Sequence, residues 1–549
     1  MTRLGRRHSH LTILVGFVAA ACAYIFFLEP WGHDTWYHLQ RLLDIQGQFQ
    51  HGTLRAHFAE NAAGGKGLPV WIYYSQWIYW PPMLLDSLGA GPLISLKVIY
   101  CGFLIVCCVG CYRLLKLHAD EGPAVLGTLL FVTSNYVVGE IFQRSAYAEY
   151  LSVALLPFLL FAMNRVLRQG GKGAMLTLVL TASLMILSHP LSFMNAGYAL
   201  AAYAAYVMLC WRLPAIRLVH LCVLFLLALG LTAFYWLPAV IETRYVLGAE
   251  GVPTPLQDTF LTIPGYFRFH SILSLGFVLT GYAIAVFGSL LLRRADRDAQ
   301  VLRTSWPLVV AILVYVYLTL RLSEPVYMSV PLLASNLWVW RVLFPMTLLV
   351  VLFIVGNFRS LPRSLRSDTV VNAVAVLAVL QATAFVLFYT ASDVSVRRLE
   401  IAEIQDALAD ETQRLEGFGI DEYLPQPRAL PKPDAECPSA RAVAPNGLYQ
   451  MRFTVEAGDA NACIHLPRYW NTRYQASIDG EEIPVYADSD GEILVAPEGR
   501  SGTVTVRFGR PAYVRLSDYL SGTAAVMVLV TLAWPCLAGI VRKNMPDAT

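Results

Sequence analysis

The sequence predicts a mainly α-helical protein that crosses a membrane many times and carries one small β-domain outside the membrane, before the last helix. The composition is the first reason: 56% of the residues are hydrophobic, 14% are charged and the mean hydropathy is +0.52, which excludes a water-soluble globule. Apolar stretches of about 20 residues, the length that spans a bilayer, recur along the chain. Hydropathy then falls between residues 393 and 517, where strand-like alternation appears.

Twelve stretches are long and apolar enough to be membrane spans. They are residues 11–28, 90–112, 122–140, 148–166, 173–190, 194–211, 217–239, 271–292, 305–321, 340–357, 370–392 and 519–541. The first stretch follows Arg3, Arg6 and Arg7, as in a signal peptide, but it lacks a small-residue cleavage site. We therefore expect an uncleaved helix.

The chain is predicted to have three parts. A transmembrane body, residues 1–392, contains an outer loop at 29–89; residues 393–517 form an extracytoplasmic module; residues 518–549 form the final helix and a cytoplasmic tail. The module begins with a helical stretch at about 396–416 and a proline-rich connector from Pro425 to Pro433. Its sequence shows no recognisable nucleophile, metal cluster or phosphate loop, and a lid or carbohydrate-contacting platform is expected.

Strand signals support this module. Residues 448–455 and 503–508 alternate between apolar and polar side chains, as half-buried strands do. Asp479-Gly480 and Asp490-Gly491 are typical hairpin turns. The sequence therefore predicts a small antiparallel β-domain.

The distribution of basic residues predicts the orientation. Arginine and lysine gather in the loops that the predicted spans place on the same side of the membrane as the N-terminus. They are sparser in the longer loops on the opposite side. Because positive charge is retained in the cytoplasm, the N-terminus is predicted to be cytoplasmic and the β-domain to lie outside. The expected location is the cytoplasmic (inner) membrane of the cell, crossed in multiple passes.

The net charge and the cysteines exclude some functions and leave one pairing open. A net charge of +3 without a basic cluster among aromatic residues gives no reason to expect nucleic-acid binding. Eight of the ten cysteines lie in or beside spans and are expected to pack as small apolar residues. Cys437 and Cys463 lie in the outer module. In an oxidising compartment they could form a disulfide with each other, and whether they do so is left open.

The segment with the densest chemistry follows the first span. It contains His33, Asp34, Tyr37, His38 and Arg41. On a helix, Asp34, His38 and Arg41 would lie on one face, because the successive spacings between them are four and three residues. An acid at the aqueous mouth of a membrane helix is a candidate general base, provided that it comes within hydrogen-bond reach of a hydroxyl.

Other polar residues stand at helix ends predicted to face the same side of the membrane. They are Arg144, Glu149, His189, Glu242 and Arg341. Ionisable groups at membrane depth are costly and usually face a cavity. Arginine suits phosphate because its planar guanidinium donates two hydrogen bonds at once. These residues predict a polar cavity able to hold an anionic lipid headgroup and a sugar, with membrane lipid around it.

Each of these residues also has a structural interpretation. Asp34 is suited to capping a helix N-terminus, and His38 to satisfying a buried structural hydrogen bond. Arg144 and Arg341 are suited to reach the interface as anchors. His189, which precedes Pro190, is placed to bond a carbonyl freed at a helix end.

Two further alternatives concern aromatic residues and metals. A run of aromatic residues is more typical of a belt at the membrane interface than of a platform for sugar rings, which is the alternative. The run consists of Trp71, Tyr73, Tyr74, Trp77, Tyr79 and Trp80. A metal site made of His33, Asp34 and His38 matches no specific ligand signature. No cofactor is therefore assigned, and assistance by a divalent cation is left open.

The chain resembles the GT-C superfamily of membrane glycosyltransferases. More closely, it resembles bacterial membrane proteins described as six-pyruvoyl-tetrahydropterin-synthase-related and membrane proteins that glycosylate lipoteichoic acid. The resemblance is carried by Gly32-His33-Asp34 with Tyr37-His38, Arg144 to Glu149, Glu422-Tyr423-Leu424-Pro425, Leu466 to Trp470 and Ile478-Asp479-Gly480. The soluble fold and the histidine set of the pterin synthase itself are not found in this sequence.

The resemblance implies transfer of a sugar from a polyprenyl-phosphate carrier to a glycan, lipid or protein acceptor outside the cytoplasmic membrane. Asp34 maps onto the superfamily's usual catalytic position and is the candidate base. Arg144 and Arg341 are candidate contacts to the phosphate, and this assignment comes from their location and charge alone. Two alternatives stay open: a flippase or transporter for lipid-linked saccharides, and a non-catalytic assembly protein of cell-envelope polysaccharide synthesis. We find no clear internal repeat of the kind that transporters usually show.

Overall fold

The structure is a computed structural model. It describes residues 3–27, 32, 34–60, 62–247, 256–267, 271–272, 274–292, 296–330, 333, 338–391, 423–433, 440–442, 449–456, 458 and 462–543. His33, Cys437, Glu422 and the helix expected at 396–416 lie outside the described residues.

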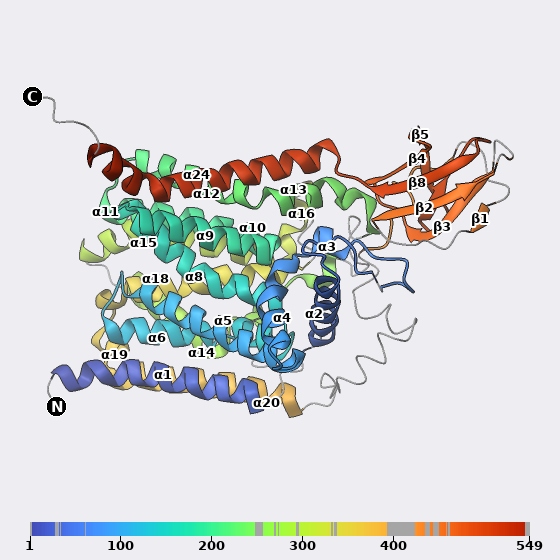
Figure 1. The fold of residues 1–549 in the computed structure, drawn as a ribbon. Coiled ribbons are helices and arrows are strands. Elements are labelled where there is room, and N and C mark those ends of the chain that lie inside the picture. Colours follow the sequence, from blue (N-terminus) through green and yellow to red (C-terminus); the bar gives the residue numbers. More distant parts are fainter. Residues whose placement is uncertain are drawn as a thin grey trace, which may run out of the picture.

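Long helices running in roughly one direction form the body of the molecule (Figure 1). They are α1 (Arg3–Phe27), α5 (Pro92–Leu115), α6 (Glu121–Val132), α7 (Asn135–Phe142), α8 (Tyr147–Arg168), α9 (Lys172–Ser188), α10 (Pro190–Asn195), α11 (Gly197–Trp211), α12 (Ile216–Leu231), α13 (Ala233–Glu242), α14 (Phe277–Leu292), α15 (Asp296–Thr319), α18 (Leu343–Gly356), α20 (Asp368–Ala391) and α24 (Ala512–Lys543). The protein is thus mainly helical, as predicted.

The described helices fit a membrane to different degrees. Five are long and apolar enough to cross one, and two bent pairs raise this number to seven if each pair is a single span. Four shorter apolar helices lie among them, at Leu11–Phe27, Lys172–Ser188, Phe277–Leu291 and Thr304–Thr319. Every stretch expected to be a span contains helix, but twelve crossings remain a prediction.

A side-chain hydroxyl bonds a backbone carbonyl at each of the two bends. The pair α6–α7 bends by 48° and the pair α12–α13 by 72°. At the first bend Thr133 Oγ1 donates to Leu129 O at 2.6 Å, and at the second Thr232 Oγ1 donates to Ala228 O at 2.9 Å. A hydroxyl that occupies the carbonyl four residues back competes with the helical ladder and favours a bend.

One end of the bundle carries the elements of the outer loop and the β-module, while α1 begins and α24 ends at the other end (Figure 1). The outer loop contains α2 (Thr35–Gln50), α3 (Val70–Tyr73), η1 (Gln76–Tyr79) and α4 (Trp80–Ser87). Its aromatic run packs mainly inward: Tyr79 is fully buried and Trp71 Nε1 donates to Asp44 Oδ2 at 2.8 Å. These rings form a core for the outer loop, which neither sequence interpretation anticipated.

The β-module consists of two four-stranded sheets with strand orders β1-β3-β7-β6 and β2-β8-β4-β5. The strands are β1 (Ala440–Ala442), β2 (Gln450–Val455), β3 (Cys463–Tyr469), β4 (Tyr474–Ile478), β5 (Glu481–Ile483), β6 (Val485–Ala487), β7 (Glu492–Val495) and β8 (Gly502–Phe508). β2 and β8 pair antiparallel, and the inward residues of the alternating strands, such as Met451 and Val504, form one core. The expected β-domain is therefore present, but it is not wholly antiparallel, because β1 pairs parallel with β3.

Two local predictions in the module have different outcomes. Asp479 and Gly480 join β4 to β5 with φ values of +46° and +96°, which two-residue hairpin turns require. Cys463 is disulfide-bonded. Its pairing with Cys437 stays a prediction, because Cys437 is outside the described residues.

Buried ion pairs attach the β-module to the helical body. Arg473 Nη2 lies 2.6 Å from Glu242 Oε1 at the end of α13, and both side chains are almost fully buried. Tyr513 of α24 donates to the same oxygen at 3.1 Å. From the outer loop, Arg55 Nη1 donates to Asp518 Oδ1 at 3.0 Å. The module is therefore held by the body, and the outer loop is tied to the last helix.

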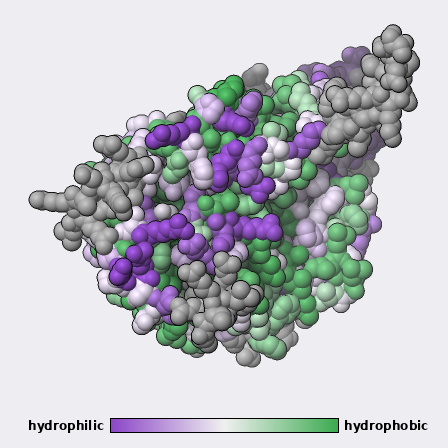
Figure 2. All heavy atoms as spheres, turned by 90° about the vertical axis from the view of Figure 1, so that its left-hand side faces the viewer, coloured by the Kyte–Doolittle hydropathy of each residue, from purple (hydrophilic) through white to green (hydrophobic). Residues whose placement is uncertain are grey.

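The opposite end of the bundle is strongly hydrophilic. Figure 2 shows a broad hydrophilic area there, with hydrophobic residues on the flanks. The last turns of α5 and α8 carry Arg113, Arg165 and Arg168, and α19 (Arg363–Arg366) contributes further arginines. This arrangement matches the basic loops found in the sequence.

Candidate functional site

The candidate site forms where the start of α2 meets the turn between α7 and α8. Asp34 N donates to Arg144 O at 2.8 Å, and Gly32 N donates to Ser145 Oγ at 2.8 Å. A Cβ atom on residue 32 would lie 2.2 Å from the Arg144 carbonyl carbon. Only glycine allows two backbones to approach so closely. The Gly32-His33-Asp34 motif therefore fixes Asp34 next to Arg144.

Asp34 occupies the N-cap position of α2 without performing the capping role. Its side chain makes no capping hydrogen bond. Its Oδ2 atom lies 3.6 Å from Arg144 Nη2, which is beyond hydrogen-bond range, and 23% of the side chain is exposed. The acid thus stands at the open edge of the site.

Arg144 lies behind Asp34 in a buried network. Its Nη1 atom donates to Glu140 Oε1 at 2.7 Å and to Glu149 Oε2 at 2.8 Å. The guanidinium also lies over the Trp340 ring, 4.9 Å from its centroid. Burial opposes the charge, but Glu140 and Glu149 raise the pKa of Arg144 above its ordinary value. The arginine therefore remains charged.

Glu149 joins the second predicted arginine to the first. Its Oε2 atom lies 3.4 Å from Arg341 Nε, and Tyr136 donates to its Oε1 at 2.6 Å. Both oxygens of this nearly inaccessible carboxylate are therefore engaged within the protein. Glu149, predicted as a substrate contact, positions Arg144 and Arg341 in this structure.

His38 has both ring nitrogens engaged within the protein. The Tyr147 N–H donates to Nε2 at 3.1 Å, so the proton is on Nδ1, which lies 2.7 Å from Tyr79 Oη. Burial, followed by the charge of Arg41, lowers the pKa of His38 to about 3. A neutral His38 thus holds α2 against the start of α8, which agrees with its structural interpretation.

The other predicted residues of α2 have different environments. Arg41 is buried, with its guanidinium 4.0 Å from the centroid of the Tyr74 ring. Tyr37 is half-buried on the same helix. His33 lies outside the described residues. Arg41 therefore packs among the aromatic residues of the outer loop.

His189 and Glu242 also serve local structure. His189 is the N-cap of α10, and its Nδ1 accepts from Ser192 N at 3.2 Å, so it caps amide groups and not the freed carbonyl that was expected. Glu149 and Arg341 are among its electrostatic neighbours. Glu242, predicted to share the cavity, is instead fully buried in the separate ion pair with Arg473.

A small, mostly apolar pocket lies beside the first turn of α2. It is lined by Thr35, His38, Leu93, Leu96, Lys97 and Tyr100. Lys97 is buried in α5 and donates to Phe26 O at 3.3 Å. The sequence analysis missed this residue, although a lysine inside an apolar span was itself a signal of function.

A second pocket, of about 320 Å³, lies between the outer loop, α13 and the β-module. Its polar lining includes Arg55, His57 and Arg473, and its aromatic lining includes Trp71 and Trp77. Part of the aromatic run thus faces a pocket, at a place distinct from Asp34.

Comparison with solved structures gave distant similarities. The arabinofuranosyltransferase AftD from Mycobacteria is 13% identical, with a TM-score of 0.42 over 70% of this chain and 27% of that chain. The archaeal oligosaccharyltransferase AglB from Archaeoglobus fulgidus, in complex with an inhibitory peptide and a dolichol-phosphate, is 12% identical, with a TM-score of 0.42 over 80% and 62%. ArnT from Cupriavidus metallidurans, bound to undecaprenyl phosphate, is 12% identical, with a TM-score of 0.39 over 88% and 98%.

The chain therefore spans about a quarter of the length of AftD and less than two thirds of AglB. No curated protein matches the sequence. The model of a family described as "6-pyruvoyl-tetrahydropterin synthase related domain; membrane protein" matches residues 73–394, more than half of the chain. The protein belongs to this family of membrane proteins, as its sequence motifs suggested.

Proposed function

We propose that the protein is a GT-C-type glycosyltransferase that moves a sugar from a polyprenyl-phosphate carrier to an acceptor at the outer face of the cytoplasmic membrane. The observation that carries this proposal is the partly exposed carboxylate of Asp34 in front of Arg144, at the same end of the bundle as the β-module. The motif around Asp34, which resembles that of the superfamily, supports the same assignment.

Asp34 acts as the general base in this reaction. It takes the proton of an acceptor hydroxyl while that oxygen bonds to the anomeric carbon of the sugar. The bond between the anomeric carbon and the phosphate oxygen breaks, and polyprenyl phosphate leaves with the electron pair. The partial exposure of Asp34 gives the acceptor access to the carboxylate.

Arg144 and Arg341 stabilise the phosphate of the leaving group. A charged guanidinium that the protein already orients stabilises developing negative charge without reorganising during the reaction. Glu149 supplies this orientation because it contacts both arginines.

A flippase for lipid-linked saccharides is the second candidate. The bent helix pairs α6–α7 and α12–α13 favour it, because transporters use broken helices to build their binding sites. The clustering of acid and arginine at one end of the bundle favours the transferase. The two functions differ in outcome: a transferase forms a glycosylated product, whereas a flippase moves the labelled lipid-linked sugar without forming one.

Asp34→Asn tests the proposal. The variant keeps the shape of the side chain and removes the base, so product formation should fall by about 10²- to 10⁴-fold. The protein is placed in proteoliposomes with native membrane acceptors and a panel of radiolabelled polyprenyl-phosphate sugars. Asp258→Asn, at an exposed acid, is the matched control and should retain full activity. Product formed by Asp34→Asn at a near wild-type rate would refute the role of Asp34.

A further inference from the structure

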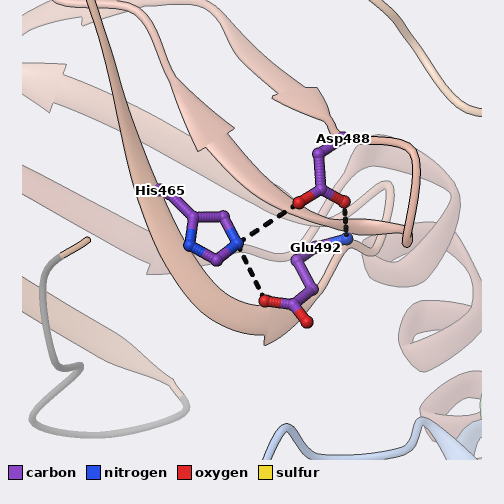
Figure 3. Close-up of side chains that lie close together, drawn as sticks. All are labelled: His465, Asp488 and Glu492. Carbon is purple, nitrogen blue, oxygen red and sulfur yellow. Dashed lines mark hydrogen bonds and ion pairs between the residues drawn. The ribbon is translucent and has the colours of Figure 1, made fainter. Parts of the chain in front are cut away.

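His465, Asp488 and Glu492 converge on one spot of the β-module (Figure 3). Sequence analysis found no metal cluster there, because the histidine and the acids are far apart in the chain and strand pairing brings them together. His465 in β3 pairs with Leu494 in β7. Since side chains two positions apart on a strand share a face, Glu492 lies diagonally next to His465. Asp488 enters from the turn before β7.

The three side chains have the spacing of metal ligands. His465 Nε2 lies 2.8 Å from Glu492 Oε2 and 3.2 Å from Asp488 Oδ2. All three candidate ligand atoms lie within 4.8 Å of one another. Zinc bonds to imidazole and carboxylate are about 2.0–2.2 Å long, which separates neighbouring ligand atoms in a tetrahedral site by about 3.4 Å. Small movements of the side chains would therefore admit the ion.

The second oxygen of each carboxylate is held by donors other than His465. Asp488 Oδ1 accepts from Asp490 N at 2.9 Å and from Glu492 N at 2.8 Å. Glu492 Oε1 lies 2.5 Å from Lys66 Nζ. One oxygen of each acid is thus anchored, and the other faces His465. Metal sites use outer donors in this way to orient their ligands.

Charge and exposure also suit a cation. Two carboxylates face one imidazole and one ammonium, and the side chains of His465 and Asp488 are about a quarter exposed. An ion can therefore enter from solvent. Three protein ligands leave further coordination positions for water.

We propose that His465, Asp488 and Glu492 form a binding site for a divalent transition-metal ion, with Zn²⁺ the best match to one imidazole and two carboxylates. The site also affects the outer loop, because Glu492 contacts Lys66 and Tyr469 N donates to Lys66 O at 3.2 Å. A bound ion fixes Glu492 and thereby the contact between the β-module and this loop. The inference is independent of the proposed glycosyl transfer.

Metal binding is tested on the purified full-length protein in detergent, without a histidine tag and after removal of metals with a chelator. Titration with Zn²⁺ should give about one bound ion per chain by equilibrium dialysis. The thermal midpoint should rise with Zn²⁺ concentration, because a ligand that binds the folded state stabilises it. Mn²⁺ and Mg²⁺ are titrated in parallel and should give smaller shifts.

His465→Ala and Glu492→Gln should lose this ion and the rise in midpoint, whereas Asp490→Asn, an exposed neighbour in the same turn, should retain both. Only the monodisperse fraction of each variant is dialysed, so a folding defect is not mistaken for lost binding. If both ligand variants bind Zn²⁺ as the wild type does, or if the wild type binds none, the cluster is an ion-pair network and the proposal is wrong.

Discussion

At the scale of single residues, Glu149 determines how both candidate phosphate-binding arginines are placed. Its Oε2 accepts a hydrogen bond from Arg144 and its Oε1 accepts one from Tyr136. It also forms an ion pair with Arg341. Removing one member of a buried charged network leaves its partners desolvated and unpaired, at a cost greater than the net contribution of the network. Glu149 and the two arginines behind Asp34 therefore keep one another in place.

Arg144→Met should lower the free energy of unfolding by about 3–5 kcal/mol, because Glu140 and Glu149 lose their main partner in a buried site. The thermal midpoint in detergent measures this loss. Arg359→Met is the control: the Arg359 side chain is 78% exposed where it pairs with Asp120, so the expected change is about 0–1 kcal/mol. Equal losses in the two variants would mean that the Arg144 network is not tightly buried.

Part of this site could be predicted from the sequence. An acid after the first span and arginines at other helix ends are visible in the hydropathy pattern, and the structure brings Asp34, Arg144 and Arg341 together. The partners of Glu242 and His38 could not be predicted. They depend on Arg473 from the β-module and on the Tyr147 backbone, which no local pattern links to them.

At the scale of elements, α2 is held by a half-buried acid, Asp44, as well as by His38. Asp44 Oδ2 accepts from Trp71 Nε1 at 2.8 Å and from Gln48 Nε2 at 2.7 Å. Burial raises the pKa of Asp44 to about 7, against the lowering effect of these two donors, and Glu60 adds to the rise. The packing of α2 on α3 therefore includes a group that titrates near neutral pH.

As the pH rises from about 4 to about 7, Asp44 should lower the thermal midpoint of the wild type relative to that of Asp44→Asn. In that range folded Asp44 retains a proton that the unfolded chain has already lost, so this group makes raising the pH favour the unfolded state. Asp44→Asn should remove this contribution, so its midpoint should rise relative to that of the wild type between about pH 5 and pH 8. Asp258→Asn, at an exposed acid, should keep the wild-type slope. Identical slopes in Asp44→Asn and the wild type would exclude Asp44 as the source.

At the scale of the whole molecule, the two ends of the bundle differ in chemistry. One end bears the β-module, the outer loop and Asp34, and the other is a hydrophilic face with arginine-rich helix ends (Figures 1 and 2). Positive charge near helix ends is retained in the cytoplasm. The end with the β-module is therefore expected to lie outside the cell membrane.

Cysteine labelling tests this orientation. In a chain whose exposed Cys210 and Cys222 are replaced by serine, Ser489→Cys at the β-module should react with a membrane-impermeant maleimide in intact cells. Ser364→Cys, exposed in α19, should react only after lysis. The reverse pattern would show that the orientation is inverted and that Asp34 faces the cytoplasm.

The overall architecture was more predictable than its details. Apolar length located the helices, and alternation located strands such as β2 and β8. The bends at Thr133 and Thr232 were not predicted, because a hydroxyl within an apolar run barely changes its hydropathy. The division of the module into two sheets depends on long-range pairing, which strand alternation does not specify.

The close approach at Gly32 limits how the site can vary. Because the backbone amides of Gly32 and Asp34 donate to the Ser145 hydroxyl and to the Arg144 carbonyl, a shift of the α7–α8 turn would carry the acid with it. The separation between Asp34 and the Arg144 guanidinium is therefore set largely by the approach of these two chain segments. Under the proposed function, relatives that take different sugars would be expected to vary the surrounding pocket and to leave this spacing unchanged.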